Sequence, residues 1–141
     1  MPGSDAPKAT ALECVIPILR VLRLSTSIDY YVGRLGFKVD WHQPGAMASV
    51  SRDGRALMLC EGAQGNPGTW VWIGVHDAAT LFDEYAAKGA TIRRTPTNYP
   101  WAYEMHVEDP DGHILRFGSE PRSDRPFAAW SQDSTANTVV D

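Results

Sequence analysis

The strongest constraint on the fold is an ordered series of strand, helix and three short strands that occurs twice along the chain. Apolar periodicity and turn residues predict the first series at 13–21 (strand), 25–35 (helix), 37–41, 46–51 and 55–60 (strands). They predict the second at 69–75 (strand), 77–88 (helix), and about 91–95, 102–108 and 113–118 (strands). Corresponding landmarks keep similar offsets, since Val21 and Val75 are 54 residues apart, and Gly36 and Gly89 are 53 apart. Gly54 and Gly112 are 58 apart. The chain is therefore predicted to use one βαβββ unit twice.

These elements predict an α+β fold of two βαβββ modules, at 13–60 and 69–118, with paired, curved mixed sheets and helices on their outer faces. The 141 residues suit a single domain, expected at 13–119. Residues 1–12 are expected to be a flexible N-terminus, and 120–141 a polar tail whose aromatic residues are Phe127 and Trp130. The sequence leaves open whether that tail is disordered or crosses the site.

Composition excludes several classes of protein. Seventeen acidic against 13 basic residues give a net charge of −4 without a Lys/Arg cluster, which argues against nucleic-acid binding. No apolar run is long enough to span a membrane. Two cysteines and the absence of a secretory leader favour a reduced, cytoplasmic protein. Fourteen aromatic residues, including five Trp, exceed what one small core needs.

Period-two alternation assigns the strand residues to faces. Val71, Ile73 and Val75 are expected to pack under a helix, together with Leu115 and Phe117. The opposite face would carry Trp70, Trp72, Ile114, Arg116 and Gly118. In the strand at 102–108, alternation against Met105 and Val107 places Glu104 and His106 on that open face too. Two open sheet faces would together enclose a cup.

The doubled βαβββ unit, LGF at 35–37 and the turn DPDGHILRF at 109–117 resemble the glyoxalase, bleomycin-resistance and extradiol-dioxygenase superfamily. Enzymes of this superfamily hold a divalent metal through His or Glu on the first and last strands of each unit. The resemblance maps these positions onto Ile16, Met58, Trp70 and Arg116. None of these side chains is a suitable ligand, so the resemblance implies no metal, no cofactor and no catalytic residue here.

The residues are more similar to the bleomycin-resistance branch, which binds its antibiotic without transforming it. TWVWI (69–73) and PWAYEMHVEDPDGHILRF (100–117) carry this similarity, which implies that Trp41 and Trp101 grip a planar ligand. Trp70 and Trp72 are further candidates, with core or dimer packing as the alternative. The remaining candidate ligand-binding residues are Met58, Tyr103, Glu104, His106 and Arg116, although Arg116 is expected to form an ion pair with Glu104.

The predicted function is a non-enzymatic binder of a bleomycin-type or other planar antibiotic, in a groove of a homodimer. Proline cannot donate to a sheet ladder, so Pro17 is expected at a sheet edge or a crossing point. At this place the resemblance implies an exchange of the first strand between subunits; a simple bulge is the alternative. One competing hypothesis is a glyoxalase- or dioxygenase-type enzyme with a displaced metal site built from Glu61, Glu104 and His106. Another is a regulatory or scaffolding subunit whose cup is filled by its own side chains.

Overall fold

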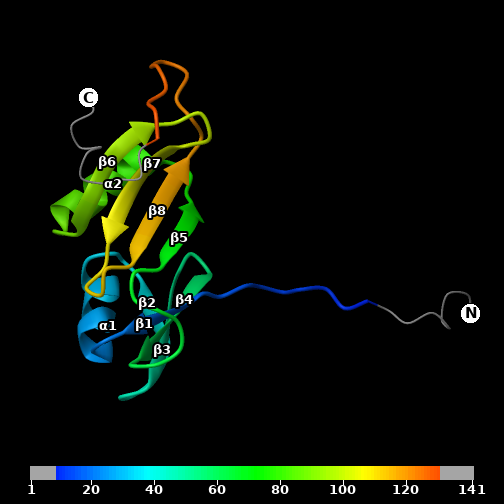
Figure 1. The fold of residues 1–141 in the computed structure, drawn as a ribbon, viewed down its shortest axis with the longest axis vertical. Coiled ribbons are helices and arrows are strands. Elements are labelled where there is room, and N and C mark those ends of the chain that lie inside the picture. Colours follow the sequence, from blue (N-terminus) through cyan, green and yellow to red (C-terminus); the bar gives the residue numbers. More distant parts are fainter. Residues whose placement is uncertain (1–8, 131–141) are drawn as a thin grey trace, which may run out of the picture.

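Ten elements form two similar halves in the computed structural model, which describes residues 9–130. The first half contains β1 (Ile18–Val21), α1 (Leu24–Gly33), β2 (Lys38–Gln43), β3 (Met47–Arg52) and β4 (Arg55–Glu61). The second contains β5 (Trp70–Gly74), α2 (Ala78–Ala87), β6 (Thr91–Asn98), β7 (Tyr103–Glu108) and β8 (Ile114–Ser119). Each half is thus one βαβββ unit, and Figure 1 shows the two units end to end.

Each half builds one four-stranded mixed sheet, in the orders β1-β4-β3-β2 and β5-β8-β7-β6. The first strand runs parallel to the last in both sheets, and the other pairs are antiparallel. Ile18 lies opposite Met58, and Trp72 lies opposite Arg116. Ile18 and Trp72 are 54 residues apart, and Met58 and Arg116 are 58 apart, which are the offsets found between the sequence landmarks. The pairing of the strands therefore confirms the predicted repeat.

A helix covers one face of each sheet. Helix α1 packs on β2, β3 and β4, and α2 packs on β6, β7 and β8. Asp77 caps α2 by accepting from the backbone N–H groups of Ala79 and Thr80, and Glu61 Oε2 accepts from the N–H of Leu24 at the start of α1. Leu115, Phe117, Met105 and Val107 belong to the core cluster, and Val71 and Ile73 pack against it, which confirms the predicted assignment of faces.

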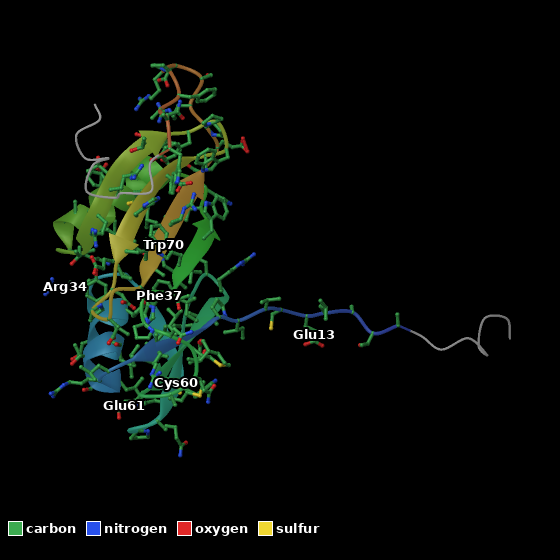
Figure 2. All side chains as sticks on the ribbon, in the orientation of Figure 1. Glu13, Arg34, Phe37, Cys60, Glu61 and Trp70 are labelled. Carbon is green, nitrogen blue, oxygen red and sulfur yellow. The ribbon has the colours of Figure 1, made fainter. Side chains whose placement is uncertain are left out.

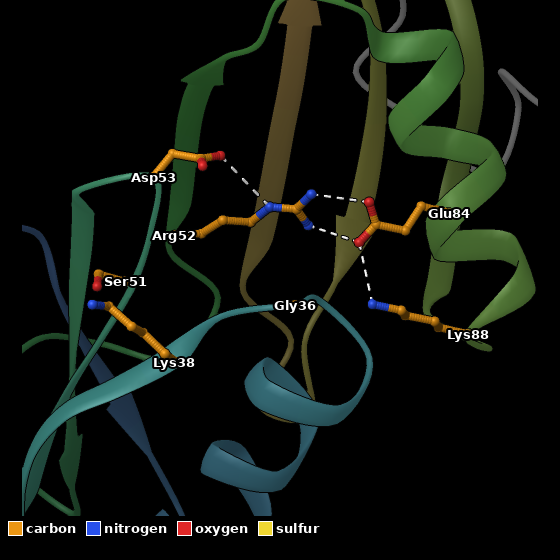
Figure 3. Close-up of a pocket in the computed structure, with 7 residues that line it drawn as sticks. All are labelled: Gly36, Lys38, Ser51, Arg52, Asp53, Glu84 and Lys88. Atoms are coloured by element: carbon orange, nitrogen blue, oxygen red, sulfur yellow. Dashed lines mark hydrogen bonds and ion pairs between the residues drawn. The ribbon is translucent and has the colours of Figure 1, made fainter.

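The two halves are joined by hydrogen bonds between buried or half-buried groups. Tyr31 donates to Asp109 Oδ2 at 2.8 Å, and Tyr85 donates to the carbonyl of Leu35 at 2.8 Å. Arg52, at the end of β3, donates through Nη1 and Nη2 to the two carboxylate oxygens of Glu84 on α2, at 2.8 and 2.9 Å. Figure 3 shows this pair bridging the halves in a polar pocket that Lys88 also lines.

The first strand is shorter than predicted, because β1 begins at Ile18 rather than at residue 13. Pro17 has no N–H to donate, and Leu12 and Val15 before it are 89% and 85% exposed. Residues 9–17 project away from the body of the chain (Figure 1). The remaining parts of the predicted terminal segments, 1–8 and 131–141, lie outside the described residues. No helix in the described part of the chain is long and apolar enough to cross a membrane.

Candidate ligand-binding site

A row of polar residues crosses the open face of the second sheet. Register aligns Trp72 with Arg116, Arg116 with His106, and His106 with Arg94, one residue from each of β5, β8, β7 and β6. Arg94 and His106 are buried and Arg116 is partly buried, although all three lie on the side away from the helix. Charged and polar groups on a buried surface require partners, and Glu104 on β7 supplies one for His106 and for Arg116.

Glu104 accepts hydrogen bonds from four side chains at the centre of this face. His106 Nε2 and Arg116 Nε donate to Oε2, both at 2.8 Å. Trp101 Nε1 at 2.9 Å and Trp72 Nε1 at 3.4 Å donate to Oε1. Glu104, His106, Arg116, Trp72 and Trp101 are called the Glu104 cluster below.

The hydrogen bonds determine the charge of Glu104, and burial determines that of His106. Burial alone would raise the pKa of Glu104, but the hydrogen bonds from His106, Arg116 and Trp101 outweigh it and lower that pKa to about 2. Burial lowers the pKa of His106, despite the neighbouring carboxylate. A neutral His106 donates from Nε2 to the carboxylate, which leaves Nδ1 as an acceptor with no hydrogen-bond partner among the described residues. The predicted Glu104–Arg116 ion pair is therefore present beside a neutral imidazole.

Indole rings surround the Glu104 cluster. Trp101 stacks on buried Tyr99 with ring centroids 4.8 Å apart and planes 3° apart. Trp70 contacts the His106 ring edge-on at 5.7 Å. Trp72 lies over Gly118, where an added Cβ would come within 2.7 Å of Cζ2 of the indole. An open hollow of about 430 Å³ lies beside Trp72 and Trp101, with Gly74 and Gly118 in its lining.

Trp130, from the segment after β8, is a member of this aromatic group that the strand pattern did not identify. Its ring lies 5.6 Å from that of Tyr99, 5.9 Å from that of Trp101 and 5.8 Å from that of His106. Its presence in a polar tail is the only sequence signal for this position, because no periodicity connects a loop residue with a sheet face.

The structure brings together six of the nine predicted site residues: Trp70, Trp72, Trp101, Glu104, His106 and Arg116. Tyr103 alternates to the other face of β7, where its ring contacts Arg122 and Arg125. Met58 and Trp41 lie in the first sheet, in a row that runs Ile18, Met58, Ser49, Trp41. Within residues 9–130, Trp41 makes no ring contact with the second half, so one chain alone does not place it against Trp101.

The residues at the superfamily's metal positions do not fit a metal ion. An isoleucine, a thioether, an indole and a guanidinium offer no set of hard or borderline donors. Among the described residues, no three His, Cys, Asp or Glu side chains are grouped so that they could hold a metal. Glu61 caps α1 in the first half of the molecule, whereas Glu104 and His106 lie in the second half, as Trp70 does (Figure 2). Glu61 therefore does not join Glu104 and His106 in one site.

Comparison with known proteins identifies the family. The model of the Glyoxalase/Bleomycin resistance protein/Dioxygenase superfamily matches residues 13–117, so the chain belongs to this superfamily. A comparison with curated proteins finds no match.

Solved structures share the fold at low sequence identity. TnmS3, an antibiotic binding protein from Streptomyces sp. CB03234, is 23% identical, with a TM-score of 0.70 over 81% of this chain and 100% of that one. The bleomycin-binding protein of Streptomyces verticillus, solved with copper(II)-bleomycin, is 23% identical with a TM-score of 0.69 over the same shares. TioX from Micromonospora sp. ML1 is 22% identical, with a TM-score of 0.69 over 77% of this chain and 98% of that one.

Proposed function

We propose that this protein binds a planar, amphipathic small molecule of the antibiotic type without transforming it. The observation that carries the proposal is a group of half-exposed indoles held around a fully paired carboxylate. Trp70, Trp72 and Trp101 are 47%, 52% and 49% exposed. The hydrogen bonds to Glu104 hold two of these indoles in place, which reduces the entropy that a stacking ligand must overcome. Two structural relatives are described as binding antibiotics, which favours this class of ligand.

We further propose that the complete groove forms between two chains of a homodimer. The face of the first sheet that carries Ile18, Met58 and Trp41 is open, with Ile18 and Trp41 38% and 44% exposed. In a twofold dimer this face of one chain can cover the Glu104 cluster of the other, giving two equal sites. The projecting residues 9–17 are suited to extend onto the partner, as an exchanged first strand does.

Dimerisation is tested by light scattering coupled to gel filtration, on wild type and Val15→Asp. Wild type is expected at about 31 kDa, twice the chain mass of 15.5 kDa. Val15→Asp places a charge on the exposed arm and is expected to shift the protein toward monomer, whereas Ser123→Asp, on the exposed loop after β8, leaves the dimer intact. A wild-type monomer at high micromolar concentration would contradict the proposed groove.

Ligand binding is tested by thermal shift and calorimetry with metal-free and copper-loaded bleomycin, followed by other planar antibiotics. Trp101→Ala is expected to abolish most of the shift, because it removes the stacked ring and one donor to Glu104. Phe127→Ala, which removes an exposed ring outside the cluster, is the matched control. A shift that survives Trp101→Ala unchanged would show that the ligand binds elsewhere.

The metal-dependent alternative is tested by elemental analysis of the purified protein. The side chains at the superfamily's metal positions are poor donors, so we expect less than about 0.1 equivalent of Zn, Ni, Mn or Fe per chain. Adventitious binding accounts for an amount below this threshold. One tightly held equivalent would reassign the protein to the enzymatic branches of the superfamily.

A further inference from the structure

Three sulfur-bearing residues lie on the open face of the first sheet, Met47 on β3 and Met58 and Cys60 on β4. Their neighbours along these strands belong to the core cluster on the helix side: Ala48, Leu57 and Leu59. Because side chains alternate between the two faces of a strand, all three sulfur-bearing residues share the face away from α1. They are called the sulfur cluster below.

The strand register brings the members of the sulfur cluster close together. Met47 lies directly opposite Cys60. The N–H of Glu61 donates to the carbonyl of Ala46 at 2.8 Å in the next pair. Met47 and Cys60 are therefore a non-hydrogen-bonded pair, in which the Cα atoms are about 4.5 Å apart and the side chains are closest. Met58 precedes Cys60 by two residues on the same face, about 7 Å along the strand. Two flexible thioether side chains can thus reach the position of one thiol.

Cys60 is a free thiol shielded from solvent. Its exposed fraction is 6%, and Met47 and Met58 beside it are half-buried. Cys14, the other cysteine, is exposed on the segment that projects from the body of the chain (Figure 1). Cys60 is therefore placed beside two thioethers and not beside a disulfide partner.

This set of donors favours Cu(I) over other metal ions. Thiolate and thioether sulfur are soft ligands, which select Cu(I). Zn²⁺ takes thiolates, imidazoles and carboxylates, and thioethers are not among its usual ligands. One thiolate and one monovalent cation also sum to zero charge, which suits a buried position, whereas a divalent ion would leave a net charge there.

Arg20 is the charged residue that the register places beside this position. It lies opposite Cys60 on β1, and its Nη2 donates to the carbonyl of Gly62 at 2.8 Å in an exposed contact. A neutral thiolate–Cu(I) complex carries no net charge for this guanidinium to repel.

We infer that the sulfur cluster is a Cu(I) site in which the Cys60 thiolate and the thioethers of Met47 and Met58 are the three ligands. The thiol gives up its proton as the ion binds, so one proton is released per Cu(I) and no oxidation state changes. Of the three ligands, Met58 alone stands at one of the superfamily's metal positions, and the other two come from positions that the superfamily's enzymes do not use in the resemblance above. The site is independent of the proposed binding of an antibiotic.

Competition with bicinchoninate, a chromogenic chelator of Cu(I), tests the site under anaerobic conditions with ascorbate as the reductant. Every protein in the series carries Cys14→Ser, which removes the exposed thiol as a competing ligand. This parent is expected to take one equivalent of Cu(I) per chain from the chelator, and Cys60→Ser should abolish the uptake. Met47→Leu and Met58→Leu should each weaken binding by at least about tenfold, since a direct ligand matters no less than a group that orients one. Met105→Leu, which alters a buried methionine of the second half, is the matched control and should bind like the parent.

X-ray absorption of the copper-loaded parent is a second readout that does not depend on the folding of any further variant. It is expected to show a first coordination shell of sulfur alone. Absence of Cu(I) uptake by the parent, unchanged affinity in both methionine variants, or nitrogen or oxygen in the first shell overturns the inference. Antibiotic binding is measured on the metal-free protein, so its failure would refute the proposed function and leave the Cu(I) site standing.

Discussion

At the scale of single residues, Glu104 organises the candidate site because it is the one acceptor shared by two indoles, an imidazole and a guanidinium. Its 0% exposure makes each of these contacts energetically significant, since water cannot replace a lost partner. The indoles of the candidate site are therefore positioned by a group that the proposed ligand need not touch.

Removal of this charge should destabilise the fold as well as the site. Glu104→Gln leaves Arg116 without its carboxylate and is expected to lower the free energy of unfolding by about 2–4 kcal/mol. Urea denaturation followed by tryptophan fluorescence measures the change. Asp83→Asn, an exposed carboxylate on α2, is the matched control and should alter stability by less than about 0.5 kcal/mol. Equal effects of the two substitutions would show that the cluster contributes nothing to stability.

The same residue predicts how stability depends on pH. The folded pKa of Glu104, about 2, lies below its unfolded value, so its contribution is complete above about pH 4.5 and is lost as pH falls toward 2. His106 also lowers the stability of the folded protein as pH falls below about 6.5. Its pKa is lowered in the folded state, so the unfolded chain takes up the proton first. Unfolding free energies at pH 7, 5 and 3 should therefore decrease in that order. Glu104→Gln should flatten the step between pH 5 and 3, and an unchanged step would contradict the assignment.

At the scale of elements, the last strand of the second half is shaped to carry an indole. Gly118 on β8 leaves no side chain under Trp72 of the neighbouring β5, so the ring lies close to the backbone. An added Cβ would stand 2.7 Å from the indole and 3.2 Å from the Cβ of Ala102. The strand pairing and this missing side chain together determine how far Trp72 projects toward a ligand.

Gly118→Ala should displace Trp72 without unfolding the sheet. Because the indole is half-exposed it can move away, so the cost in stability is expected to be only about 1–2 kcal/mol. Gly118→Ala should lower the melting temperature of the free protein slightly. It should reduce the further rise in melting temperature that a bound ligand produces by a larger amount. Gly33→Ala, at a position with no atom within 4 Å of the added Cβ, is the control for an added methyl group. Identical ligand-induced shifts for wild type and Gly118→Ala would show that Trp72 is not part of the site.

At the scale of the whole molecule, the two halves hold each other in register through contacts on the helix side of the sheets. The Arg52–Glu84 pair is about 30% exposed at each side chain, and Arg52 also donates to the carbonyl of Leu35. Its two parallel N–H···O bonds give it more directional strength than a single surface ion pair has. The orientation of one open face relative to the other depends on such contacts.

Arg52→Met should weaken the junction between the halves. We expect a loss of about 1–3 kcal/mol in unfolding free energy, because Glu84 and the Leu35 carbonyl lose a charged donor. Arg55→Met removes an exposed guanidinium that, among residues 9–130, donates only to the nearby Asp53 carbonyl; it is the matched control and should have little effect. Chemical denaturation of both variants measures the difference, and an equal loss would locate the coupling of the halves elsewhere.

The sequence by itself determined the doubled βαβββ order, the faces of the strands and the location of Glu104 and His106 on the open face, because these depend on local periodicity and on turns. It also showed that the superfamily's metal positions lack ligands, since that follows from residue identity. Only the tertiary structure decided that β1 starts at Ile18 and that Trp130 reaches the cluster. These features depend on contacts between distant segments, such as Asn98 with residues 122–128, and no local pattern encodes them.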